Sequence, residues 1–166
     1  MKMAASFWFL RARAYKKTFP FHGDMSIGVA VAKNVEGPYL INDEPVFSKD
    51  HFGEVEDPFL WKDNTGFHLL VKDQRGTITG KKHSGLIAHS DDGLQWKLDK
   101  NPLAYTKTIH WSDGTMHEMG QLERAFGLIE NGNLAYLFFA TMDGPGGFNN
   151  ATRSWNMVVP LKQDKK

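Results

Sequence analysis

The sequence predicts an all-β fold, and three observations carry the prediction. Aromatic residues make up 13% of the 166 residues and glycine accounts for 16 of them. This composition favours strands joined by tight turns. Short apolar runs recur along the chain, separated by Gly, Asn and Asp. No stretch keeps apolar residues at the i, i+3, i+4, i+7 spacing of an amphipathic helix over three turns.

The predicted strands follow one another at short intervals. The aromatic run 6–10 and the Gly- and Val-rich run 27–32 come first, and the run 155–159 closes the chain. Between them lie three predicted hairpins, each with Asn or Asp and a Gly in its turn. The first hairpin has strands 59–62 and 67–72 with the turn 63–66 between them. The second has strands 85–89 and 94–98 with the turn 90–93, and the third has strands 125–129 and 134–140 with the turn 130–133.

Charge and composition exclude several classes of function. The net charge is +1 and no basic face is indicated, so we expect no nucleic-acid partner. Cysteine is absent, which excludes disulfides, thiolate nucleophiles and Cys-based zinc sites. No apolar run reaches the length of a membrane span, so no membrane partner is expected. Arg11 and Arg13 interrupt the apolar start of the chain, so its apolar segment is too short for a signal peptide. We expect this segment to belong to the fold.

The chain also repeats itself. Gly28 and Gly85 lie 57 residues apart, and the same spacing separates Tyr39 from Trp96, Pro45 from Pro102 and Val46 from Leu103. Trp155 and Pro160 suggest a third copy. Four strands in roughly 60 residues are typical of one blade of a β-propeller. A β-sandwich would also give short strands but would not require this period, and chance similarity among hairpins is the remaining alternative.

The predicted architecture is therefore a single β-propeller-type domain over residues 1–166. Its blade parts cover about 1–48, 54–103 and 122–161. The strand count corresponds to about two and a half blades, which is half of a five-bladed propeller. An open blade edge leaves backbone groups unpaired. A homodimer that completes the ring is therefore the expected partner arrangement.

Two acidic residues stand out within this repeat. Asp57 and Glu123 each precede a predicted inner strand, nine residues before the turn glycines Gly66 and Gly132. This register predicts that the two carboxylates occupy equivalent positions and face one another across a pocket. Paired acids with different protonation states are what glycoside hydrolysis requires. The alternatives are that Asp57 caps a turn before Pro58 and that Glu123 forms a surface ion pair with its neighbour.

Three segments carry a resemblance to a known group of enzymes. They are 55–70 (VEDPFLWKDNTGFHLL), 122–137 (LERAFGLIENGNLAYL) and 26–39 (SIGVAVAKNVEGPY). They resemble, in this order, the second-acid blade, the general-acid blade and an outer strand of the five-bladed propeller glycoside hydrolases. The nearest groups are family 43 and relatives such as family 117. The chain looks like the C-terminal half of such an enzyme.

The resemblance implies an inverting glycosidase acting on plant or algal oligosaccharides. Glu123 would be the general acid, Asp57 the acid that orients it and tunes its pKa, and His117 a residue near the reacting sugar. Arg124 and Glu56 would contact the substrate. Trp111 lies in the long polar connection 103–122 and is the candidate for a sugar-stacking platform.

One part of the family pattern is missing. The resemblance implies a general base on an Asp of an upstream blade, and no such motif is present. Asp24, Asp113 and Glu118 are the candidates to replace it. The alternative functions are a non-catalytic carbohydrate-binding half-propeller and an interaction domain in which the acids are surface caps. No cofactor and no metal ligand at the site are expected, although the resemblance allows a central calcium near His89. Relatives are often secreted or periplasmic, and the chain itself indicates no location.

Overall fold

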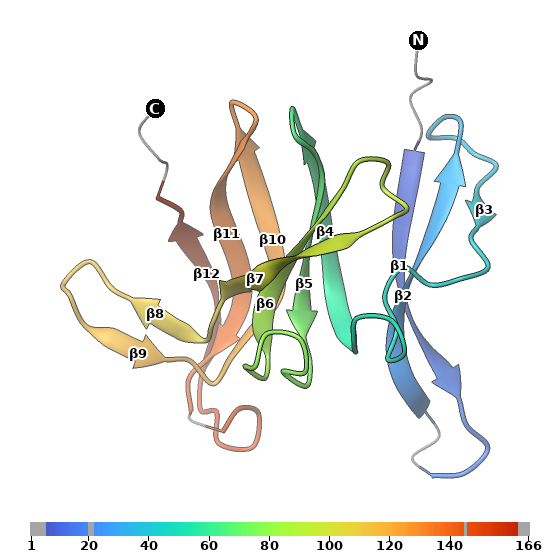
Figure 1. The fold of residues 1–166 in the computed structure, drawn as a ribbon. Helices are drawn as coiled ribbons and strands as arrows, with labels where there is room; N and C mark the ends of the chain where they lie inside the picture. Colours follow the sequence, from blue (N-terminus) through green and yellow to red (C-terminus); the bar gives the residue numbers. More distant parts are fainter. Residues whose placement is uncertain (1–5, 20–21, 145, 163–166) are drawn as a thin grey trace.

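The computed structural model describes residues 6–19, 22–144 and 146–162, and this part of the chain consists of β-strands joined by turns and loops, without a helix (Figure 1). The prediction of an all-β fold is confirmed. Among the described residues there is no helix that could cross a membrane. The strands are β1 (Ser6–Tyr15), β2 (His22–Ala32), β3 (Leu40–Ile41), β4 (Val55–Asp63), β5 (Gly66–Asp73), β6 (Ser84–Ser90), β7 (Lys97–Tyr105), β8 (Thr108–His110), β9 (Met116–Glu118), β10 (Gln121–Glu130), β11 (Asn133–Met142) and β12 (Ser154–Pro160).

The strands form four antiparallel sheets, each built from consecutive segments of the chain. We call β1–β3 the N-terminal sheet, β4–β7 the central sheet and β10–β12 the C-terminal sheet. The fourth sheet is the small hairpin β8–β9. The central sheet lies between the other two, and the β8–β9 hairpin projects from the body of the molecule (Figure 1).

The three predicted hairpins are present as β4–β5, β6–β7 and β10–β11. In the β10–β11 turn, Asn131 and Gly132 have φ values of 52° and 79°. Positive φ at both central residues is the requirement of a type I′ turn, which explains the Asn-Gly pair. The pairing of β1 with β2 and the hairpin β8–β9 were not predicted. The segment 103–122 was expected to be a connection, because the residues of β8 and β9 are largely exposed and show no apolar alternation.

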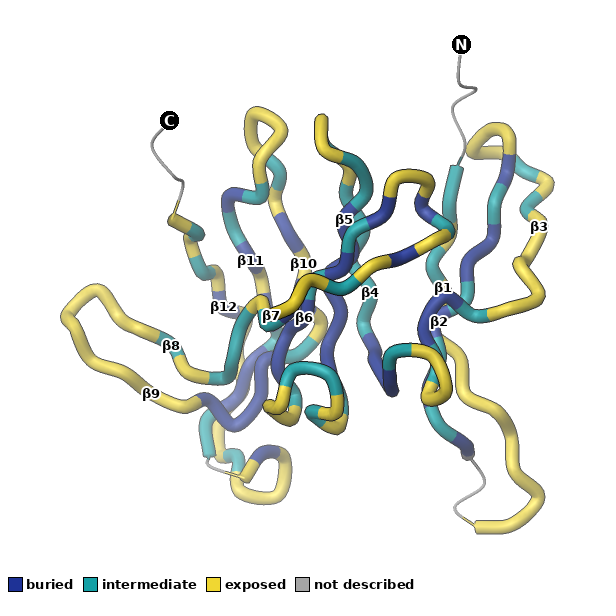
Figure 2. Tube along the Cα trace, in the orientation of Figure 1, coloured by how far each residue is buried: buried dark blue, intermediate teal, exposed yellow. Residues whose placement is uncertain are grey.

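Two apolar layers hold the three larger sheets together. Leu69 and Val71 of β5 pack toward the N-terminal sheet, with Ile27, Val29 and Phe47. Leu70, between them in sequence, packs toward the C-terminal sheet. The central sheet is therefore covered on both faces, which agrees with the unbroken buried run of β5 (Figure 2).

The 57-residue repeat has a structural counterpart in one pair of segments only. Gly28 lies in β2 and Gly85 in β6, and each of these strands pairs with the last strand of its sheet. The predicted third copy of the repeat, at Trp155 and Pro160, is wrong. Trp155 lies in β12, the third strand of its sheet, whereas Trp96 precedes β7, the fourth strand of its own.

Candidate functional site

The first strands of the central and C-terminal sheets carry a β-bulge at the same place. The register shifts between Glu56 and Phe59 in β4, and between Glu123 and Phe126 in β10. Asp57 and Arg124 sit in these bulges with φ values of 55° and 53°. Left-handed residues of this kind bend a strand and redirect the side chains beside them.

The bulges show which residues of the two hairpins correspond. Glu56 corresponds to Glu123, and Asp57 corresponds to Arg124. The predicted equivalence of Asp57 with Glu123 is therefore wrong by one residue. The prediction aligned the two hairpins on their turn glycines. These glycines are not equivalent, because Gly66 is the first residue of β5 whereas Gly132 lies within the turn before β11.

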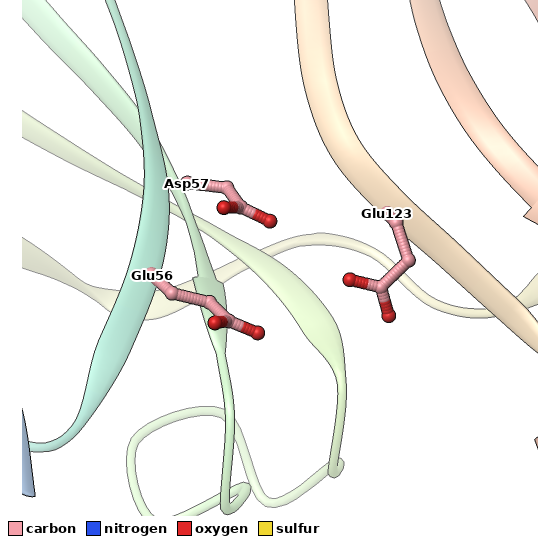
Figure 3. Close-up of side chains that lie close together, drawn as sticks. All are labelled: Glu56, Asp57 and Glu123. Carbon is pink, nitrogen blue, oxygen red and sulfur yellow. The ribbon is translucent and has the colours of Figure 1, made fainter. Parts of the chain in front are cut away.

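The bulges nevertheless bring three carboxylates together. Glu56 and Asp57 project from β4 toward Glu123 on β10 (Figure 3). One oxygen of each carboxylate lies within 4.8 Å of the others. Glu56 is buried, and the side chains of Asp57 and Glu123 are 14% and 16% exposed. We call these three residues the carboxylate cluster.

Lys72 of β5 lies between the two sheets and joins their acids. It is the cross-strand partner of Glu56, and its Nζ lies 2.7 Å from Glu56 Oε1. The same ammonium donates a hydrogen bond to Glu123 Oε2. Its side chain is only 3% exposed. A lysine this deeply buried remains charged only where carboxylates offset the loss of solvation.

Arg11 of β1 completes the ionic network from the N-terminal sheet. Its Nη1 lies 2.9 Å from Glu56 Oε2 and 3.4 Å from Asp57 Oδ1. Three carboxylates thus face two cations, and all three larger sheets contribute to one site.

Tyr105, the last residue of β7, marks the low polarity beside the cluster. Burial raises the pKa of its hydroxyl well above the usual range, and the negative charges of Glu123, Asp57 and Glu56 raise it further. The ring packs edge-to-face on Phe139, and it lies where a Cβ at Gly85 would be.

The spacing within the cluster limits its chemistry. The acid and base of an inverting glycosidase lie about 6.5–9.5 Å apart, to leave room for a water molecule. In the carboxylate cluster, one oxygen of each carboxylate lies within 4.8 Å of the others, which is closer than this. The arrangement suits an acid with a neighbour that orients it, rather than an acid and base on opposite sides of a sugar.

A calcium ion does not fit the carboxylate cluster. Calcium takes six to eight oxygen ligands. Here the ammonium of Lys72 binds Glu56 and Glu123, and Arg11 binds Glu56 and Asp57. Two cations already face the oxygens that calcium would need. His89 lies elsewhere on the central sheet, in β6, and its ring nitrogens face His68 and Asp99.

The other predicted residues lie outside the carboxylate cluster. Trp111 and His117 are neighbours on the projecting hairpin, with ring centroids 6.4 Å apart, and His117 is exposed. Arg124 is exposed beside Glu123 in the bulge. Of the candidate bases, Asp24 pairs with Lys49 and Arg75, Glu118 pairs with Lys107, and Asp113 binds Thr115 at the hairpin tip.

Lys72 and Arg11 are the site residues that sequence reasoning missed. Lys72 follows the apolar run Leu69–Val71 and is as buried as its neighbours. A lysine that continues a buried strand is a signal for a buried ion pair, because lysine is almost never fully buried without a partner. Arg11 carried no such signal.

Comparison of the chain with protein-family models, curated proteins and solved structures gives no match.

Proposed function

We propose that the chain is part of a five-bladed propeller glycoside hydrolase that cleaves a plant or algal oligosaccharide with inversion. The observation that carries the proposal is the carboxylate cluster. Glu56, Asp57 and Glu123 come from the first strands of neighbouring sheets and meet beside bulges at corresponding positions. Segments 55–70 and 122–137, which resemble the acid-bearing blades of these enzymes, include these three acids.

Glu123 is the general acid in this proposal. Lys72 binds its Oε2, and among the described residues its Oε1 has no hydrogen-bond or ion-pair partner. This oxygen is available to the leaving oxygen of a glycosidic bond. Asp57 orients Glu123, and exposed Arg124 supplies a contact to sugar hydroxyls.

The general base comes from outside the carboxylate cluster, because the cluster is too compact to hold the attacking water between two of its members. Asp24, Asp113 and Glu118 are the candidates, from the same chain or from a second copy.

A second copy of the chain completes the propeller. Each of the two outer sheets exposes apolar side chains on one face among the described residues, and on the N-terminal sheet Tyr39 covers part of that face by stacking on Trp8. Trp8 and Leu10 are 54% and 40% exposed on β1, on the face opposite the one that packs against the central sheet. Phe138 and Val158, a cross-strand pair of the C-terminal sheet, are 37% and 51% exposed. Pairing the first face of one copy with the second face of the other buries both, in a closed two-fold arrangement.

A carbohydrate-binding half-propeller without turnover is the second candidate. Two observations favour it. One oxygen of each carboxylate lies closer to the others than an acid lies to its base in an inverting enzyme. Every carboxylate of the cluster is also ion-paired to Lys72 or Arg11.

The test is hydrolysis of a panel of aryl glycosides and plant and algal oligosaccharides by the purified chain, alongside Glu123→Gln. Glu130→Gln is the matched control, because Glu130 is an exposed acid at the other end of β10. Loss of a general acid typically costs about 10²–10⁴-fold in rate. We expect such a loss for Glu123→Gln and none for Glu130→Gln.

Two results would contradict the glycosidase proposal. Equal turnover by wild type and Glu123→Gln would remove Glu123 from the chemistry. No turnover on any substrate, with sugar binding retained, would establish the binding module instead.

A further inference from the structure

An open cavity of about 470 Å³ lies beyond the carboxylate cluster, where β5 ends and β6 begins. It is lined by Arg13, Glu54, Gln74, Arg75, Lys82 and His83.

The strand register places this cavity next to the carboxylate cluster. Side chains two residues apart on a strand share a face and lie about 6.6 Å apart along it. Arg13 stands in this relation to Arg11, Glu54 to Glu56 and Gln74 to Lys72. The ladder continues past the strand ends, because the Gln74 N–H donates to the Glu54 carbonyl at 3.2 Å. The cavity is therefore one row of side chains beyond the carboxylate cluster, a step comparable to one sugar residue.

The charge of the cavity is opposite to that of the carboxylate cluster. Arg13, Arg75 and Lys82 oppose a single lining carboxylate, Glu54. Glu54 is 4% exposed and already bound, since the Met25 N–H donates to its Oε1 at 3.1 Å and Arg75 donates to its Oε2. Asp24 pairs with Arg75 at 3.7 Å on the outer side. A net positive lining remains even when Asp24 is counted.

Two buried polar atoms of the lining have no hydrogen-bond partner within the described part of the chain. They are Gln74 Oε1 and His83 Nδ1. Burial lowers the pKa of His83, and the nearby charge of Lys72 lowers it further. Buried polar atoms in native proteins are nearly always paired, with protein, water or ligand.

The loop that presents these groups is held in place from beneath. Asp73 is fully buried, and its carboxylate accepts hydrogen bonds from the N–H groups of Gly76, Ile78 and Thr79 at 2.8–3.0 Å. The His83 N–H closes the loop onto the Asp73 carbonyl at 2.8 Å. The backbone that carries Arg75 and Lys82 is therefore held in one conformation before a ligand binds.

We propose that this cavity binds the carboxylate or sulfate group of an anionic sugar, one residue away from the sugar whose bond faces Glu123. The inference rests on the proposed function and gives it a substrate class, namely an acidic oligosaccharide. Arg13, Arg75 and Lys82 of the lining attract the anion.

The test is calorimetric binding of three probes: digalacturonate, a sulfated galactobiose and neutral galactobiose. We expect one or both anionic probes to bind at least about tenfold more tightly than the neutral one, since hydrogen bonds to a charged group are stronger than those between neutral groups. The preferred anion distinguishes carboxylate from sulfate. Inorganic sulfate alone should bind much more weakly than either anionic disaccharide.

Lys82→Gln is the test variant and Lys81→Gln the matched control, because both lysines are exposed on the same loop and only Lys82 lines the cavity. We expect Lys82→Gln to lose most of the preference for the anionic probe and Lys81→Gln to keep it. The imidazole NMR signals of His83 should shift on binding of the anionic probe, which locates the ligand without any substitution.

The outcomes separate the two proposals. Equal binding of anionic and neutral disaccharides, or equal binding of inorganic sulfate, would overturn the acidic-sugar inference, even if Glu123-dependent hydrolysis of neutral substrates is found. Tight, Lys82-dependent binding of an anionic disaccharide without hydrolysis would support the acidic-sugar inference and contradict the glycosidase proposal. An anionic preference that leaves His83 and Lys82 unaffected would also overturn it.

Discussion

Lys72 carries a positive charge into the interface between two sheets, where it binds Glu56 and Glu123. Replacing it by Met removes the partner and leaves Glu56 buried with less compensation. Breaking a buried ion pair from one side typically costs about 3–5 kcal/mol. We expect Lys72→Met to lower the free energy of unfolding by this amount in urea denaturation.

Lys97→Met is the control for Lys72, because the Lys97 side chain is 76% exposed and pairs with an exposed Asp91. Its effect should stay within about 0.5 kcal/mol. Equal effects of the two substitutions would show that the Lys72 ion pairs do not stabilise the fold.

Asp143 joins the end of β11 to the start of β12. Its carboxylate accepts hydrogen bonds from the Arg153 N–H, the Thr152 N–H and the Thr152 hydroxyl, each at 2.8 Å. The Arg153 N–H is the largest of the effects that hold the pKa of Asp143 well below its usual range. A lowered pKa in the folded state stabilises the fold above the unfolded value of about 3.9, and this stabilisation is lost as pH falls through the folded value.

We therefore expect Asp143→Asn to lower the melting temperature at pH 7, with a difference from wild type that shrinks as the pH falls below about 4. The measurement is thermal unfolding followed at a series of pH values. Asp91→Asn, at a side chain that is 86% exposed, should show neither effect. A difference that stays constant down to low pH would contradict the assignment.

Sequence reasoning identified all three acids of the cluster but not their geometry. Asp57 and Glu123 could be found because each precedes a recognisable hairpin. Their relative register could not, because a bulge adds a residue to a strand without a reliable signal in composition. Arg11 reaches the site from another sheet, and such contacts depend on how sheets pack rather than on local pattern.

At the scale of the strands, Gly85 and Gly28 can be compared directly, because they differ in the space around them. Both lie in strands, 57 residues apart. A Cβ at Gly85 would overlap the ring of Tyr105, whereas a Cβ at Gly28 would meet nothing within 4 Å. We expect Gly85→Ala to cost about 1–3 kcal/mol, as overpacking does, and Gly28→Ala to be nearly neutral.

Chemical denaturation of the two glycine variants provides the comparison. Gly85→Ala should also change the near-ultraviolet circular dichroism, because Tyr105 must move away from Phe139. If the two substitutions have the same cost, Tyr105 does not occupy the place described.

The hairpins with clear turn residues could be predicted from the sequence, whereas the largely exposed hairpin β8–β9 could not. The turns 63–66 and 130–133 combine Asn and Gly between apolar strands, which is the strongest local signal for a hairpin. The hairpin β8–β9 buries almost nothing, so no period-2 pattern marks it. Its backbone pairing alone defines it.

The proposed dimer belongs to the scale of the whole molecule. Sedimentation equilibrium at micromolar concentration should give twice the 18.8 kDa mass of the chain. Trp8→Glu and Phe138→Glu each place a charge on one of the two exposed apolar faces, and each should shift the mass to that of a monomer. Trp111→Glu, on the projecting hairpin, should leave the dimer intact. A wild-type chain of monomer mass would count against completion by a second copy.

The topology also sets an order of assembly during synthesis. Every strand pairing joins neighbours along the chain, so each sheet can form as soon as its last strand leaves the ribosome. The ionic network around the carboxylate cluster cannot form so early, because Arg11, Lys72 and Glu123 come from three different sheets. A nascent chain that has reached Tyr105 can hold its central sheet, but Lys72 then has only Glu56 beside it. The ionic network of the site is thus complete only when translation has passed β10, and a chain stalled earlier is folded in part and lacks it.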